Sequence, residues 1–172
     1  MYYQYPLEVV ARSRGATSQL EFARSAQVAL GASDEVMPKA MPRGLVLFAA
    51  HEEALDGPLR ALEEIYGSEL EIRGPRVRMI PGKPPQEPIM HVRVATRRAA
   101  AWQVLQELRA RRARVLEECV RGRLVMVRAE APLSLLVGLP AILGAITDGE
   151  ARCAMRLVRY APLQETKGGE TT

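Results

Sequence analysis

The stretch IPGKPPQEP at residues 80–88 constrains the fold more than any other part of the chain. It places four prolines and a glycine within nine residues. Because proline fixes φ and lacks a backbone N–H, neither a helix nor a central strand is expected to run through it. The 172-residue chain is therefore expected to form two small units, at 1–80 and 89–163, joined by a linker at 81–88.

The second unit shows a clear succession of hydrophobic patterns. Met90, Val92 and Val94 alternate with more polar positions in 89–96, which indicates a half-buried strand. Residues 97–112 carry an apolar stripe at helical spacing, formed by Ala101, Val104, Leu105 and Leu108. The remaining elements are predicted as strands at 113–120 and 124–131, an apolar helix at 132–146 that Pro140 kinks or divides, and a strand at 151–160.

The first unit shows a similar order with weaker signals. The predicted elements are strands at 5–13 and 44–50, helices at 17–30 and 51–67, and strand residues at 70–80. Thr17 or Ser18 is expected to cap the first helix. Its inward-facing residues are expected to be Leu20, Phe22, Ala23 and Val28. No strand pattern is clear at 31–43, where a second strand belongs.

Both units thus follow the order βαββαβ, the ferredoxin-like arrangement. The predicted fold class is α+β, with two tandem units that each have helices on one face of an antiparallel sheet and leave the other face open. Residues 164–172 are polar and low in complexity, and they are expected to form a disordered tail.

Charge is distributed unevenly between the two halves. Residues 1–84 carry 10 basic and 11 acidic side chains, whereas residues 85–172 carry 14 and 9. The second half is therefore suited to a polyanionic partner. The chain start has no signal-peptide pattern, and no apolar run has the length of a membrane span. We interpret Cys119 and Cys153 as reduced thiols, and we expect a cytoplasmic protein without a membrane partner.

No residue pattern indicates catalysis, a metal or a cofactor. The only histidines, His51 and His91, lie in different units, and no cluster of Cys or carboxylates has metal-ligand spacing. No GxxxxGK[ST] motif occurs, so no bound nucleotide is expected. The chain also lacks Asn, which excludes the Arg-plus-Asn phosphate chemistry known on some ferredoxin-like folds. We therefore expect a protein that is not an enzyme.

Two groups of arginines in the second unit are candidates for RNA contact. One is the tract ELRARRARVLEECVRG at 107–122, which is equally explained as a solvated helix end that complements the helix dipole. The other is the open sheet face, where strand alternation places His91, Arg93, Met126, Arg128, Arg152 and Arg156. Such arginines would contact phosphates and read little sequence. Stacking on bases is not expected, because no aromatic residue lies on the central strands.

The segment 132–146 is more apolar than one side of a sheet requires. Either its second face packs on the first unit, which we favour, or it forms a surface for a partner or a homodimer. The candidate residues for such a surface are Leu135, Leu136, Leu139 and Ile142.

From Glu87 to Tyr160 the chain resembles the C-terminal (fifth) domain of elongation factor G, a translational GTPase. The shared landmarks over about 75 residues are EPIM (87–90), Arg111-Arg112, Arg121-Gly122, Val127-Arg128-Ala129, Pro132-Leu133, Gly138, Thr147-x-Gly149 and Tyr160. Residues 59–80 are similar to the end of that family's third domain. The family's GTPase and fourth domains have no counterpart in this sequence.

The resemblance implies contact with ribosomal RNA through helix ends and loops. The positions in common are Arg111, Arg112, Arg121 and Arg128. The family also has arginines on both sides of the Thr-x-Gly loop, where Gly144 and Glu150 stand here, so phosphate affinity is expected to be lower at this loop.

The sequence thus predicts a non-catalytic, translation-factor-like protein that associates with the ribosome or structured RNA through phosphates. One alternative is a protein–protein interaction module without RNA binding, either a homodimer or a partner of a translational GTPase. Another is a degenerate fragment that has kept no activity.

Overall fold

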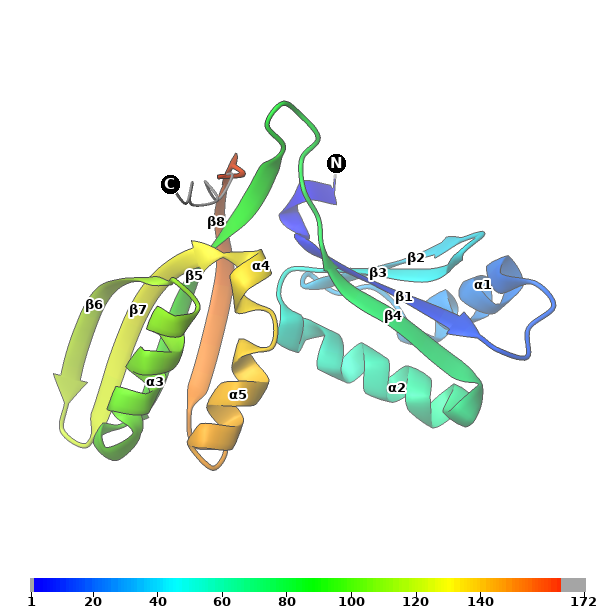
Figure 1. The fold of residues 1–172 in the computed structure, drawn as a ribbon. Coiled ribbons are helices and arrows are strands. Elements are labelled where there is room, and N and C mark those ends of the chain that lie inside the picture. The colour runs from blue at the N-terminus through cyan, green and yellow to red at the C-terminus, as the bar shows by residue number, and fades with distance from the viewer. Residues whose placement is uncertain (1, 165–172) are drawn as a thin grey trace, which may run out of the picture.

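Two four-stranded antiparallel sheets lie side by side in the computed structural model, which describes residues 2–164 (Figure 1). The predicted α+β class and the tandem ferredoxin-like arrangement are confirmed. Of the predicted tail, residues 165–172 lie outside the described residues. Within residues 2–164 no helix is long and apolar enough to cross a membrane.

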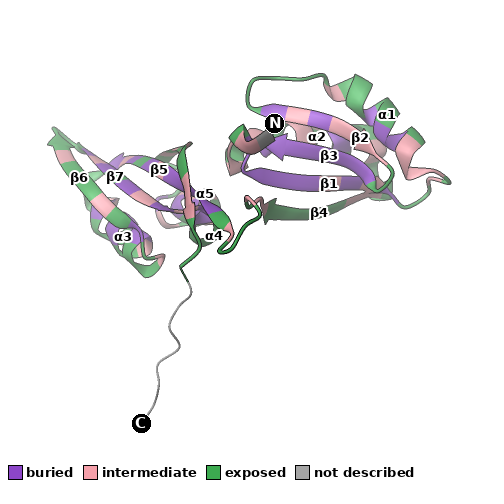
Figure 2. Cartoon of the chain, turned by 90° about the horizontal axis from the view of Figure 1, so that it is seen from above, coloured by how far each residue is buried: buried purple, intermediate pink, exposed green. Residues whose placement is uncertain are grey.

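The first unit has the sheet order β2-β3-β1-β4, with α1 and α2 on one face. Its elements are η1 (Tyr2–Gln4), β1 (Leu7–Ser13), α1 (Gln19–Leu30), β2 (Val36–Met41), β3 (Gly44–Ala49), η2 (Glu52–Leu55), α2 (Asp56–Tyr66), η3 (Gly67–Glu69) and β4 (Leu70–Val77). The central strands β1 and β3 supply most of the buried residues, as Figure 2 shows.

Strand β2 lies in the segment for which the sequence showed no clear strand. Pro38 hides the pattern, but it is tolerated because β2 is an edge strand and needs no ladder bond on its outer side. The side chain of Gln27 on α1 hydrogen-bonds to backbone groups on that outer side. Its amide donates to the Pro38 carbonyl at 3.2 Å and accepts from the Ala40 N–H at 3.1 Å.

Helix α1 corrects one predicted core residue. Phe22, Ala23 and Ala26 are buried, whereas Val28 is 85% exposed. Val28 lies five positions after Ala23, which is about 140° around a helix of 3.6 residues per turn. The N-cap is Ser18, whose hydroxyl accepts the Glu21 N–H at 3.3 Å.

The second unit has the sheet order β6-β7-β5-β8. Its elements are β5 (Gln86–Arg97), α3 (Arg98–Ala110), β6 (Arg114–Arg121), β7 (Leu124–Pro132), α4 (Leu133–Leu136), α5 (Leu139–Ile146) and β8 (Arg152–Pro162). The predicted stripe of α3 is buried as expected, with Ala101, Val104, Leu105 and Leu108 facing the sheet.

Strand β5 begins at Gln86, so the last three residues of the predicted linker belong to it. Pro88 is tolerated because β5 pairs there only with β8, opposite Tyr160; the pairing with β7 starts at Ile89. Ile80 and Gln86 exchange two backbone hydrogen bonds of 2.9 Å, which close the connection between the units.

The apolar segment divides between α4 and α5 at Val137-Gly138, and Gly138 has a φ of 85°. Pro140 lies in the first turn of α5, where proline is well accommodated. Two charged residues bind this break from opposite units. Arg111 donates to the carbonyls of Leu135 and Val137 at 3.0 and 2.9 Å. The Gly138 N–H donates to the Glu52 carboxylate at 2.9 and 3.2 Å.

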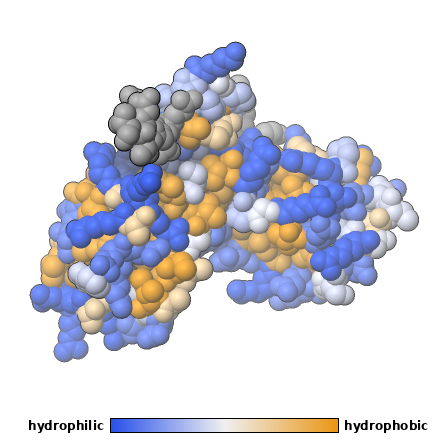
Figure 3. All heavy atoms as spheres, viewed as in Figure 1, coloured by the Kyte–Doolittle hydropathy of each residue, from blue (hydrophilic) through white to orange (hydrophobic). Residues whose placement is uncertain are grey.

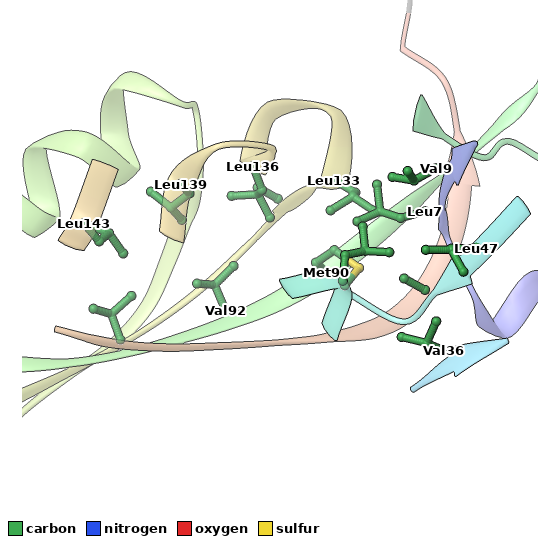
Figure 4. Close-up of a cluster of buried hydrophobic side chains, with 14 of the residues drawn as sticks. Leu7, Val9, Val36, Leu47, Met90, Val92, Leu133, Leu136, Leu139 and Leu143 are labelled. Atoms are coloured by element: carbon green, nitrogen blue, oxygen red, sulfur yellow. The ribbon is translucent and has the colours of Figure 1, made fainter. Parts of the chain in front are cut away.

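The two units also share one continuous apolar core. Figure 4 shows the row of Leu143, Leu139, Leu136 and Leu133 leading to Leu7 of the first unit, and all belong to one buried cluster. At the far end of the interface, the Tyr160 hydroxyl donates to the Tyr3 carbonyl at 2.7 Å. Leu136 and Leu139 are fully buried, so their assignment to a partner surface was wrong. Leu135 and Ile142 are 37% and 40% exposed, and Figure 3 shows hydrophobic surface over α4 and α5.

We expect Glu52→Ala to lower the free energy of unfolding by about 1–2 kcal/mol, because the Gly138 N–H loses a charged acceptor. Urea denaturation followed by circular dichroism measures the change. Glu52→Gln keeps a carbonyl acceptor and should recover part of the loss. An unchanged midpoint in Glu52→Ala would show that the contact between the units does not contribute to stability.

Candidate phosphate-binding face

The open face of the second sheet brings together arginines from three neighbouring strands, β7, β5 and β8. Because side chains alternate along a strand, the pairing register decides which of them meet. Arg93 on β5 lies opposite Arg128 on β7 and opposite Ala154 on β8. His91 lies opposite Arg156. The placement predicted for these side chains from alternation is therefore confirmed, and the helices occupy the other face.

A shallow hollow of about 380 Å³ lies at the centre of this face. Its lining residues are His91, Arg93, Arg128, Ala154, Met155 and Arg156. The short Ala154 side chain stands between longer neighbours on β8, which leaves room above the sheet. Arg152 is the first residue of β8 and lies opposite Ala95, and Met126 on β7 also lies opposite Ala95.

The arginines of this face are only partly neutralised. Arg128 pairs with Glu117 at 3.3 Å, and Glu130 pairs with both Arg114 and Arg159. Within residues 2–164, no carboxylate lies within ion-pair distance of Arg93, Arg152 or Arg156.

Like charges directly opposite on neighbouring strands destabilise a sheet. The pair Arg93 and Arg128 nevertheless occupies such positions at the centre of the face. Uncompensated cations around a hollow are an arrangement that favours an anionic ligand, and a guanidinium matches a phosphate with two parallel hydrogen bonds. This face can therefore bind anions without base recognition.

The pKa of His91 is lowered, first by burial and then by the nearby guanidinium groups of Arg156 and Arg128; Glu130 opposes the shift. The imidazole is therefore mainly neutral at neutral pH, and the arginines supply the charge of the face. His91 reports on the local field, because an anion bound in the hollow would raise its pKa.

The arginines at positions shared with elongation factor G do not gather at one site. Arg111 is engaged inside the fold, with a third hydrogen bond of 2.7 Å to Glu107, and only a fifth of its side chain is exposed. We therefore remove Arg111 from the RNA-contact candidates. Arg112, with a φ of 57°, precedes β6, and Arg121 ends it, so the two lie at opposite ends of that strand. Of the four, Arg128 lines the hollow.

Sequence reasoning did not pair Glu117 with Arg128, or Glu130 with Arg114 and Arg159, on this face. Glu117 and Glu130 determine which arginines remain uncompensated. Glu117 and Arg128 share this face because they lie opposite each other on β6 and β7. However, the bulge between Val115 and Glu117 shifts the register, and this shift was not predictable from periodicity.

Neither a metal site nor a reactive buried thiol is supported among residues 2–164. No group of three His, Cys, Asp or Glu side chains there could hold a metal ion. Burial, with a smaller contribution from Glu53 and Glu52, raises the pKa of the Cys153 thiol to about 12, so this thiol is a poor nucleophile.

The described part of the chain thus consists of two tandem ferredoxin-like units, the second with a basic open sheet face. The family model described as Elongation factor G C-terminus matches residues 85–170, which is half of the chain. The chain belongs to the elongation factor G C-terminus family, and this part of it is a translation-factor-like module.

A crystal structure of a protein from Thermus thermophilus has a similar fold, with a TM-score of 0.66 and 16% sequence identity. The match covers 91% of this chain and therefore extends over both units. It covers 40% of the Thermus protein, so the present chain spans less than half the length of that neighbour.

Substitutions of Arg111, inside the fold, and of Arg93, on the open face, are expected to differ in their effect on stability. Arg111→Ala leaves two carbonyls and Glu107 without their partner, so it should lower the free energy of unfolding by about 2–3 kcal/mol. Arg93→Ala relieves repulsion and should change it by less than about 0.5 kcal/mol, or raise it. Urea denaturation of both variants provides the test, and equal losses would contradict the division of roles.

His91 should titrate below about 6.5, the ordinary pKa of histidine. As pH falls below that value, the unfolded chain binds the proton more readily than the folded chain, so stability declines down to the folded pKa. Arg156→Ala should raise the His91 pKa, and so should added inorganic phosphate. NMR titration of the His91 imidazole measures both effects. A His91 titration unaffected by phosphate would argue against an anion in the hollow.

Proposed function

We propose that the second unit binds structured RNA, ribosomal RNA in the first place, through backbone phosphates on its open sheet face. The observation that carries this proposal is the hollow lined by Arg93, Arg128 and Arg156, two of which have no carboxylate partner within residues 2–164. Membership of the elongation factor G C-terminus family supports a role in translation, with the cytoplasm as the place of action.

The binding would be dominated by electrostatics. Arg121 and Arg152 extend the positive surface beyond the hollow, and Arg112 adds a cation near the start of β6. Phosphate contacts provide affinity and position, whereas sequence readout needs contacts to base edges. The affinity should therefore fall steeply with salt and vary little between RNA sequences of similar shape. GTP hydrolysis forms no part of this function.

A protein-interaction module is the second candidate. It is favoured by Leu135 and Ile142, which expose apolar surface on the helix side of the second unit. In this case the helix side would contact a translational GTPase or another protein, and the arginine face would remain solvated.

Cosedimentation with ribosomes across a salt series tests the RNA proposal. The double variant Arg93→Ala/Arg156→Ala should weaken binding by about tenfold or more and reduce its salt dependence. The control Arg60→Ala/Arg109→Ala removes the same charge from exposed positions on α2 and α3, away from the open face, and should have little effect. Equal losses in the two variants would indicate non-specific attraction, and salt-independent binding would contradict phosphate contacts.

A further inference from the structure

Strand β6 forms an uncovered edge of the second sheet (Figure 1). The corresponding edge of the first sheet is different: β2 contains Pro38, and Gln27 binds its outer backbone groups. Strand β6 contains no proline, and within residues 2–164 no side chain hydrogen-bonds to its backbone. A strand edge with unpaired N–H and C=O groups is a template for another strand.

The exposed side chains of β6 protect this edge only partly against pairing with another strand. Leu116 is 45% exposed and Val120 is 52% exposed, so apolar groups accompany the free backbone. Charged residues normally protect an edge by repelling an incoming strand. On β6 the charges are arranged nearly symmetrically, as RVLEECVR from Arg114 to Arg121. Whether they repel or attract a second copy depends on the register.

One antiparallel register pairs unlike charges. When Cys119 lies opposite the partner's Cys119, Glu117 lies opposite the partner's Arg121, and the reciprocal pair forms across the two-fold axis. Glu117 and Arg121 share the open face, as their pairing with Arg128 and Leu124 on β7 shows. The register centred on Glu118 instead places the two Glu118 carboxylates opposite each other, which is unfavourable. The bulge between Val115 and Glu117 lies outside the paired segment 117–121.

We propose that a second copy of this chain pairs with β6 and forms an antiparallel, two-fold symmetric dimer centred on Cys119. The two four-stranded sheets become one eight-stranded sheet. The two arginine faces then lie on the same side of a continuous surface, because residues directly opposite in a pair point to the same face. The dimer forms through its own strands and does not depend on RNA.

Oligomeric state in the absence of RNA gives the first test. Light scattering and sedimentation equilibrium over a concentration series should show a monomer–dimer equilibrium. Arg121→Glu places glutamates opposite each other and should raise the dissociation constant by about tenfold or more. The swap Glu117→Arg/Arg121→Glu restores unlike pairs and should recover dimerisation. Circular dichroism of each variant confirms that it is folded. A monomer at all concentrations, or a dimer unaffected by Arg121→Glu, overturns the proposal.

The two native cysteines test the register. Paired residues in antiparallel strands have Cα atoms about 4.5 or 5.5 Å apart, within the roughly 4.4–6.8 Å that a disulfide spans. Mild oxidation of the full chain should therefore give a covalent dimer on non-reducing gels. Cys153→Ser should retain this dimer and Cys119→Ser should abolish it, since burial raises the pKa of the Cys153 thiol to about 12. A non-covalent dimer that never yields the Cys119 disulfide contradicts this register. Because no RNA is present, none of these outcomes bears on RNA binding.

Discussion

The break between α4 and α5 is the point on which the arrangement of the two units depends. A helix that ends at Leu136 and restarts at Leu139 leaves carbonyl groups and an N–H without helical partners. Arg111 binds the carbonyls from within the second unit, and Glu52 binds the Gly138 N–H from the first. The same break lets the leucines on both of its sides turn into one core that continues between the units.

Arg111 therefore has a structural role, although it belongs to the arginine-rich tract at 107–122. A guanidinium that holds two carbonyls and a carboxylate has little freedom to meet a phosphate, even though its position is shared with elongation factor G. Positive charge for a ligand is available instead on the open sheet face, where Arg93 on β5 lies opposite Arg128 on the neighbouring strand β7. The cost of that proximity is a physical reason to regard the face as a binding surface.

The open arginine face and the unprotected β6 edge of the second unit have the same structural cause. A ferredoxin-like unit covers only one sheet face with helices, so the other face and the two outer strands remain available. In the first unit Gln27 and Pro38 close one outer strand. In the second unit neither device occurs on β6, and the arginines occupy the open face. The second unit therefore carries both surfaces for which we propose binding, the arginine face and the β6 edge.

Local patterns in the sequence determined the division into two units, the type of nearly every element and the inward faces of β5 and α3. These follow from periodicity and from proline, which act over a few neighbouring residues. Strand β2 was missed because Pro38 masks its pattern, and Val28 was misplaced because a weak helical stripe fits more than one orientation. The sequence also correctly placed the arginines of the open face by alternation. Only the tertiary structure decided which arginines are free, because their partners are distant in sequence. Glu117 meets Arg128, and Glu130 meets Arg114 and Arg159, through strand register, whereas the carbonyls at the helix break meet Arg111 through helix packing.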